Sequence, residues 1–206
     1  MSPKELYARP YTGGAEAQEE MRRTLIPELL REFPDSVREL ETPFDIAQLE
    51  VQPEALRAVA VRLKERGFNV LMDVGGVDYL PRTPRFEVVY HFVAIPGLWR
   101  LRLRVPVEES APEVPTLCDL WPSAEHAERA AWALFGIRFT DHPNLTRILL
   151  PDNWVGHPLR KDYPLQGERA KHMGPFSVRN RYHAPKRPGD PPGTCGLPRA
   201  DLGGGD

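Results

Sequence analysis

The sequence predicts an α+β fold: a single domain in which a mixed or antiparallel sheet is flanked by helices, followed by a long irregular C-terminal extension. Strand-like segments come mainly in adjacent runs rather than in strict alternation with helices, which favours this class over α/β folds. Two helical patterns flank those runs. Residues 172–206 then contain six prolines and seven glycines, a composition that buries too little apolar surface to offset the entropy of ordering.

These patterns divide the 206 residues into three parts. An irregular N-terminal segment covers residues 1–14, the α+β domain covers 15–165, and a Pro/Gly-rich arm covers 166–206. The aromatic residues Phe176 and Tyr182 are interleaved with basic residues, which favours an arm ordered against partner subunits. A disordered tail is the alternative.

The beginning of the domain predicts one helix and two strands. Apolar residues at helical spacing run through residues 15–31, and Pro27 interrupts them, so we expect a kink or two shorter helices. Weak alternation in residues 37–41 and 46–51, separated by the proline-containing residues 42–45, is typical of two short strands.

The clearest helical pattern comes next. Pro53 suits the first turn, Leu56, Val59 and Leu63 recur on one face, and Gly67 stands where a helix stops. An apolar face of this kind indicates a helix that flanks the sheet.

Three further strands follow. Residues 68–74 indicate a buried strand that ends at Gly75 and Gly76, and residues 86–95 indicate a second strand, with a turn at residues 96–99. The return strand alternates arginines with apolar residues: Arg100, Leu101, Arg102, Leu103, Arg104 and Val105. The three arginines therefore share a face away from the core, which is either solvated or turned toward a partner.

A last helix is expected between Ser123 and Phe135. Ser123 is a plausible N-cap, and Gly136 is suited to end the helix. Small residues along it would let another element pack closely: Ala127, Ala130 and Ala131.

Composition argues against several classes of protein. The formal net charge of −2 gives no electrostatic basis for binding nucleic acid. No segment approaches the roughly 20 apolar residues that span a bilayer, and the N-terminus lacks the apolar stretch of a signal peptide. We therefore expect a cytoplasmic protein that meets the membrane only through partners.

Cys118 and Cys195 are too few to hold an iron–sulfur cluster alone, and a reducing cytoplasm disfavours a disulfide between them.

Side chains that could catalyse a reaction are poorly arranged for it. No serine stands in a Gly-x-Ser-x-Gly elbow, and neither pair of adjacent glycines forms a Gly-x-Gly-x-x-Gly phosphate cradle. Six candidate metal ligands lack a spacing such as His-x-x-x-His on a helix: His126, Asp141, His142, Asp152, His157 and Asp162. We expect no catalytic, cofactor-binding or metal site in this chain.

The most informative stretch is residues 152–165, Asp-Asn-Trp-Val-Gly-His-Pro-Leu-Arg-Lys-Asp-Tyr-Pro-Leu, which has neither helical nor strand period. One interpretation is a surface loop that Trp154 anchors to the core. The other is a docking surface whose charged residues pair with a partner protein.

In the docking interpretation, Arg147, Arg160 and Lys161 contact a neighbour's carboxylates, because the planar guanidinium group gives such contacts direction. Tyr163 would fill a pocket on the partner. Asp162 either joins that surface or holds Arg160 or Arg147 within the chain.

Four motifs form a recognisable signature: Leu-Trp-Pro-Ser-Ala at 120–124, Glu-Arg-Ala-Ala-Trp-Ala-Leu-Phe-Gly-Ile at 128–137, His-Pro-Asn-Leu-Thr-Arg-Ile-Leu at 142–149, and Gly-His-Pro-Leu-Arg-Lys-Asp-Tyr-Pro at 156–164. Together they resemble the hydrophilic C subunit of bacterial NADH-quinone oxidoreductase, homologous to the mitochondrial 30-kilodalton subunit of respiratory complex I. The resemblance covers about residues 55–165.

This resemblance implies a non-catalytic structural subunit in the hydrophilic peripheral arm of a proton-translocating NADH:quinone oxidoreductase, on the cytoplasmic side of the cell inner membrane. Electrons from NADH would reach quinone through FMN and iron–sulfur clusters that other subunits hold. The implied partners are the homologue of the 49-kilodalton subunit and neighbouring iron–sulfur subunits. An equivalent scaffold subunit of a related membrane-bound hydrogenase-type complex is the alternative.

The predicted interface with those partners consists of Arg129, Arg147, Trp154, His157, Arg160, Lys161, Asp162, Tyr163, Phe176 and Tyr182. The resembling family usually carries acidic residues where Ala130 and Ala133 stand. Whatever those acids do elsewhere, this chain functions without them, which argues against an indispensable catalytic role.

Overall fold

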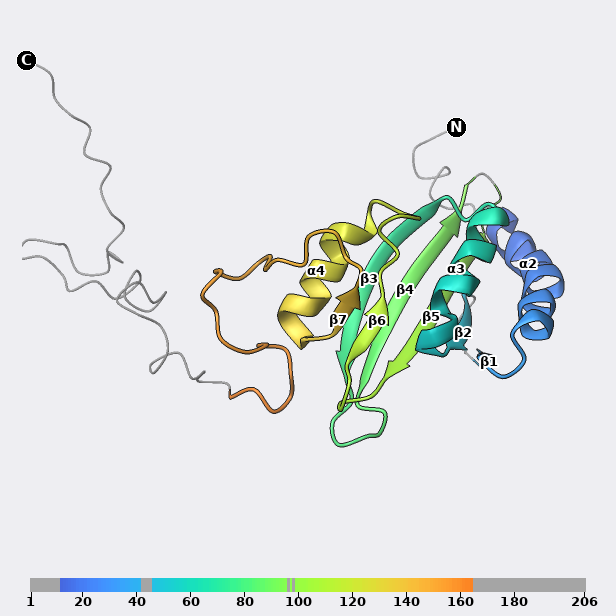
Figure 1. Cartoon of the computed structure of the whole chain (residues 1–206). Coiled ribbons are helices and arrows are strands. Elements are labelled where there is room, and N and C mark those ends of the chain that lie inside the picture. The colour runs from blue at the N-terminus through green and yellow to red at the C-terminus, as the bar shows by residue number, and fades with distance from the viewer. Residues whose placement is uncertain (1–11, 42–45, 96, 98, 165–206) are drawn as a thin grey trace, which may run out of the picture. The chain divides into compact units, whose positions relative to one another are not determined.

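The alternating apolar segments form a five-stranded mixed sheet, shown for the computed structural model in Figure 1. The structure describes residues 12–41, 46–95, 97 and 99–164, with side chains from residue 16 onward. The strands are β1 (Val37–Leu40), β2 (Ala47–Val51), β3 (Val70–Asp78), β4 (Phe86–Ala94) and β5 (Trp99–Val107). Their order is β1-β2-β5-β4-β3, with β2 and β5 parallel and the other neighbours antiparallel. The predicted α+β class is confirmed.

The chain divides into two compact units: residues 1–152 with 156–163, and residues 153–155 with 164–206. Of the second unit, only residues 153–155 and 164 are described. The predicted C-terminal arm, including Phe176 and Tyr182, therefore lies outside the described residues.

The core forms where the apolar faces of β4 and β5 meet the helices. Tyr90 on β4 and Leu103 on β5 are paired in register, and neither is exposed. The alternation predicted for β5 is confirmed, since every second residue from Leu101 to Val107 is buried. Arg104, on the other face, donates from Nε and Nη2 to the two carboxylate oxygens of Glu87 at 2.7 and 2.8 Å. The guanidinium group of Arg104 is therefore paired with a residue of the same chain and does not contact solvent alone.

The N-terminal helix is one continuous element, α2 (Thr12–Glu32). The expectation of two shorter helices at Pro27 is wrong, and the helix begins three residues before the predicted start. Proline removes one backbone hydrogen bond, but buried side chains on both sides of it hold the helix against the sheet: Met21, Leu25, Ile26 and Leu29.

The second helix follows the prediction closely. A 3₁₀ turn, η1 (Pro53–Ala55), leads into α3 (Leu56–Glu65), and its predicted apolar face is fully buried. Gly67 adopts a φ of +90°, which favours glycine and ends the helix.

Strand β3 does not end at Gly75 and Gly76, as the sequence predicts, but runs through both to Asp78. Helix α4 (Ala124–Phe135) packs along β3 at this point (Figure 1), and its packing accounts for a glycine in the strand. A Cβ atom on Gly76 would lie 2.5 Å from Cδ2 of Phe135. Gly76 therefore permits the close approach of helix and strand.

Ser123 occupies the N-cap position of α4, as predicted, but its side chain makes no capping hydrogen bond. Its backbone is already helical, and its hydroxyl donates to the carbonyl oxygen of Leu71 at 2.9 Å, which ties the start of α4 to β3. Gly136 ends the helix as predicted, with a φ of +79°. Of the three small residues expected to allow close packing, Ala131 is buried, and Ala127 and Ala130 are partly buried.

Two short strands escape sequence analysis. β6 (Glu113–Pro115) and β7 (Arg138–Thr140) form a separate parallel pair. Three residues are too few to show an alternating pattern. None of the helices in the described part of the chain is long and apolar enough to cross a membrane.

Replacing Gly76 with alanine should lower the free energy of unfolding by about 1–3 kcal/mol, because the added methyl group forces the Phe135 ring or the strand to move. Gly75→Ala is the matched control, since a Cβ there meets nothing within 4 Å. Urea unfolding of both variants measures the difference. Equal stability of the two variants would contradict the packing argument.

Candidate functional site

A buried arginine joins the segment 156–163 to the sheet. The side chain of Arg85, just before β4, is 4% exposed. Its Nε and Nη2 donate to Asp78 at 3.1 and 2.9 Å, and its Nη1 and Nη2 donate to Asp162 at 3.1 and 2.7 Å. Nη1 also donates to Glu109 at 2.5 Å. These five hydrogen bonds match the five N–H donors of a guanidinium group. We call these four residues the Arg85 clamp.

The clamp sets the charge state of its carboxylates. Hydrogen bonds from Arg85 hold the pKa of Asp78 well below its usual range, and backbone N–H groups of Lys161 and Leu80 add to this effect. Arg85 likewise lowers the pKa of Asp162. The sequence left open whether Asp162 pairs with Arg160 or Arg147. Its internal hydrogen-bond partner is instead Arg85, which lies 77 residues away in sequence.

The same segment closes the C-terminal end of α4. It supplies one donor to each of three successive carbonyl oxygens: His157 Nδ1 to Ala133 at 3.0 Å, Leu159 N to Leu134 at 3.0 Å, and Arg160 Nε to Phe135 at 2.6 Å. Carbonyls at a helix C-terminus lack intrahelical donors and carry the negative end of the helix dipole, so a cation there is stabilising. Burial lowers the pKa of His157, and its neutral ring with the proton on Nδ1 makes this bond.

Two glycines make this closure possible. A Cβ on Gly136 would lie 2.6 Å from Cδ2 of His157 and 2.7 Å from Nη2 of Arg160. Gly156 has a φ of +81°, and its Cβ would lie 2.7 Å from the ring of Tyr163. A side chain at either position would strain the backbone and displace residues of the segment.

Aromatic rings support the guanidinium groups. The Phe86 ring lies near both Arg85 and Arg160, whose Cζ atoms are 4.8 and 4.9 Å from its centroid. Arg147 lies over Trp132 at 5.3 Å. Contacts of this kind stabilise cations that are partly removed from water.

Arg129 holds the preceding part of the chain against α4. It donates to the carbonyl oxygen and the hydroxyl of Thr146 at 3.2 and 2.9 Å, and it forms an ion pair with Glu125 at 3.2 Å. Trp154 is buried, with 6% of its surface exposed. The predicted interface residues Arg129, Arg147, His157, Arg160 and Asp162 thus all make internal contacts, and their docking role stays a prediction.

Two leucines of this region are exposed. Leu159, within the segment, is 51% exposed, and Lys161 two residues later is exposed as well; Leu149, upstream of the segment, is 76% exposed. We call these three residues the outward surface. The internal contacts of the charged residues agree with the surface-loop interpretation, and the docking interpretation stays a prediction.

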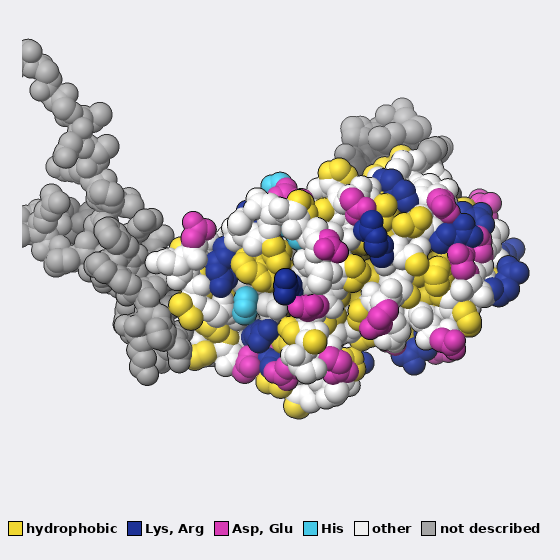
Figure 2. All heavy atoms as spheres, in the orientation of Figure 1, with side chains coloured by type: hydrophobic (Ala, Val, Ile, Leu, Met, Phe, Trp, Pro, Cys, Tyr) yellow, Lys and Arg dark blue, Asp and Glu magenta, His cyan; other side chains and the backbone are white. Residues whose placement is uncertain are grey.

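The visible face of the molecule does not carry a patch of one charge sign. In Figure 2, Lys and Arg side chains alternate with Asp and Glu over the described elements. This face lacks the basic stripe that nucleic-acid binding uses.

Comparison with known proteins identifies the family. Residues 49–169 match the family described as "Respiratory-chain NADH dehydrogenase, 30 Kd subunit". The chain belongs to this family. All the clamp residues, Gly136 and the segment 156–163 lie inside the matched range.

Relatives within the 30 Kd subunit family are similar over most of their length. The C subunit of NADH-quinone oxidoreductase from Moorella thermoacetica is 48% identical over 144 residues, which cover 69% of this chain and 95% of that protein. The C subunit from Geotalea uraniireducens is 44% identical over 151 residues, covering 72% and 92%.

Two solved structures share the fold. The trypsin-resistant fragment of Nqo5 is 36% identical with a TM-score of 0.55, covering 61% of this chain and 100% of the fragment. A chain of the membrane-bound sulfane sulfur reductase, an archaeal respiratory membrane complex, has a TM-score of 0.61 at 20% identity, covering 82% and 96%. The second likeness concerns the fold alone.

Sequence reasoning missed the centre of the site. Asp78 and Arg85 lie seven residues apart, at the end of one strand and the start of the next, and give no local signal of a pair. Glu109 had no assigned role. The one available signal was the arginine itself, which precedes a fully apolar strand face and therefore needs buried partners.

Replacing Arg85 with alanine should destabilise this 30 Kd family member by about 3–5 kcal/mol, because Asp78 would remain buried without its partner. Arg138→Ala removes an exposed ion pair with Glu113 and should cost less than about 1 kcal/mol. Urea unfolding at neutral pH compares them. A small effect of Arg85→Ala would show that the clamp contributes little.

The clamp should also make the protein sensitive to acid. The folded-state pKa of Asp78 is lowered, so its contribution to stability is present above the unfolded pKa of about 4 and is lost as the pH falls below it. Asp78→Asn should flatten the dependence of unfolding free energy on pH in that window, and the exposed Asp152→Asn should not. An unchanged slope in Asp78→Asn would contradict this account.

Proposed function

We propose that this chain is a non-catalytic structural subunit in the hydrophilic peripheral arm of a proton-translocating NADH:quinone oxidoreductase. The match of residues 49–169 to the 30 Kd subunit family carries this proposal. Two relatives named as the C subunit of this enzyme also support it. This chain covers more than nine tenths of the length of each.

The chemistry of the site supports a role in assembly. The charged groups of the site contact one another and the carbonyl oxygens at the end of α4. Among these described residues, no acid, base and nucleophile are arranged together where a substrate could reach them. FMN and the iron–sulfur clusters that carry electrons from NADH to quinone would then belong to other subunits. In this proposal, the isolated chain binds neither flavin nor iron nor NADH.

The outward surface indicates how the chain would meet a neighbour. Exposed leucines beside a lysine offer apolar contact area with a cation at its side, and a rigid loop loses little entropy on binding. We propose that the partner is the homologue of the 49-kilodalton subunit, with iron–sulfur subunits nearby. The chain would reach the cytoplasmic side of the inner membrane only through this complex.

Replacing Leu149 and Leu159 together with aspartate should weaken association with the partner subunit by at least about tenfold, because two charges would enter an apolar contact. Met72→Asp is the control, since Met72 is 65% exposed on β3 and lies far from the segment in sequence. Native gels of membranes and capture of the tagged full chain measure assembly.

The identity of the captured partners tests the function itself. Recovery of flavin- and iron–sulfur-bearing NADH dehydrogenase subunits supports the proposal. Recovery of hydrogenase-type subunits would instead support the alternative of a scaffold subunit in a related membrane-bound complex. Assembly of the Leu149/Leu159 variant equal to that of Met72→Asp would contradict the docking role of the outward surface.

A further inference from the structure

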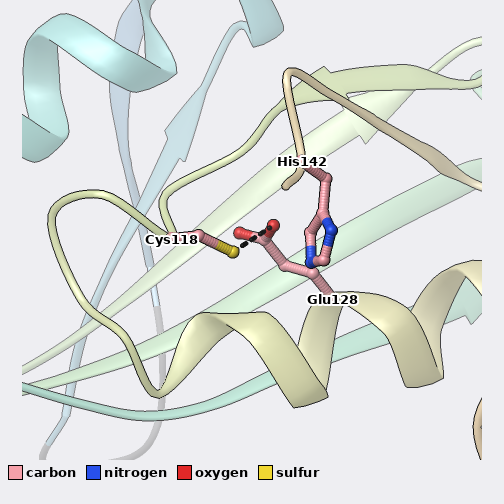
Figure 3. A group of neighbouring side chains, drawn as sticks. All are labelled: Cys118, Glu128 and His142. Carbon is pink, nitrogen blue, oxygen red and sulfur yellow. Dashed lines mark hydrogen bonds between the residues drawn. The ribbon is translucent and has the colours of Figure 1, made fainter. Parts of the chain in front are cut away.

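Three potential metal ligands converge away from the segment 156–163. Cys118 follows β6, Glu128 lies on α4, and His142 follows β7, and Figure 3 shows their side chains pointing toward one another. Their ligand atoms all lie within 4.8 Å of one another. Of the six ligand candidates considered from sequence, only His142 belongs to this group in the described part of the chain.

Glu128 is the buried member of the group. It has no exposed surface, and it accepts hydrogen bonds from the Thr116 hydroxyl at 2.5 Å and the Leu117 N–H at 2.9 Å. The Cys118 thiol donates to it at 3.4 Å. Among the described residues, no lysine or arginine forms an ion pair with Glu128. Burial of a carboxylate without a counter-charge is costly.

A buried phenol gives an independent sign that the group is incomplete. Tyr90 on β4 has no exposed surface, and its hydroxyl has no hydrogen-bond partner among the described residues. Glu128 and Cys118 lie within electrostatic range of this hydroxyl. Buried hydroxyls normally find a partner. A bound ion carrying a water molecule would supply one.

The group can be reached from solvent. A cleft of about 570 Å³ is lined by Cys118 and by residues next to the other ligands, including Thr116, Asp141 and Pro143. Cys118 is a free cysteine and is half-buried at the wall of this cleft. The cleft therefore gives an ion access to Cys118 and to the chain on either side of His142.

We propose that Cys118, Glu128 and His142 form a binding site for a zinc ion. A thiolate, a carboxylate and an imidazole are the ligand types that zinc prefers, and three protein ligands with a water in the fourth position make an open tetrahedral site. The mixed set of S, O and N atoms suits zinc better than magnesium or calcium, which take oxygen ligands.

Binding exchanges existing contacts for metal bonds. Nδ1 of His142 accepts from the Asn144 N–H at 3.0 Å, and Nε2 lies 3.2 Å from the Glu125 carbonyl oxygen, so one ring nitrogen gives up its backbone partner. The Cys118 thiol releases its proton to solvent as the sulfur binds the ion. The ion would then join α4 to the chain segments that follow β6 and β7.

Zinc titration of the full chain, freed of metal by a chelator, tests the site by calorimetry. One ion should bind per chain. Loss of a residue that only hydrogen-bonds to a metal ligand weakens metal binding by about 10–100-fold. Cys118→Ser and His142→Gln should each weaken zinc binding by more than that. The matched controls are Cys195→Ser and His126→Gln, which should bind as the unaltered chain does. His126 is exposed and outside the group.

Cobalt(II) gives a second readout that does not depend on the stability of a variant. The unaltered chain should show a tetrahedral cobalt spectrum with a sulfur-to-metal charge-transfer band, and Cys118→Ser should lose that band. No stoichiometric zinc binding, or equal binding in the ligand and control variants, would overturn the proposal. Neither readout involves partner subunits, so the result is independent of the proposed role in assembly.

Discussion

The five N–H donors of Arg85 and the three carboxylates around them are the interaction on which the rest of the site depends. A guanidinium group is expensive to bury, and it becomes favourable only when every donor is satisfied. Asp78 at the end of β3 supplies a buried acceptor, and Asp162 brings the distant segment to the same point. The sheet, the loop after β5 and the segment 156–163 therefore share one side chain.

The end of α4 is the second constraint, and it works through the backbone. Three carbonyl oxygens need donors, and the segment supplies them from two side chains and one N–H group. Gly136 and Gly156 leave the space in which those donors fit. Charges in a surface loop commonly contact only solvent, but here several of them also hold the path of the chain through internal hydrogen bonds.

Local patterns of the sequence were sufficient for most of the fold. Alternation and helical spacing located β1, β2, β4, β5 and α3 to within a few residues, because those elements bury one regular face. The errors lie where packing overrides local preference. Gly75 and Gly76 looked like the end of a strand, but the strand continues and Gly76 admits Phe135. Ser123 stands at the N-cap as predicted, but its hydroxyl binds a neighbouring strand rather than the helix. The clamp and the Cys118 group join residues far apart in sequence, and no local pattern encodes such pairs.

The long separation between Arg85 and Asp162 has a consequence for the order of folding. Closing a loop of 77 residues costs chain entropy, so we expect this contact to form late, after the β4–β5 hairpin has placed the Arg85 donors. Leu159, three residues before Asp162, takes its final position only then. In the proposed assembly role, a newly made chain would present this leucine to a partner only after that contact has formed.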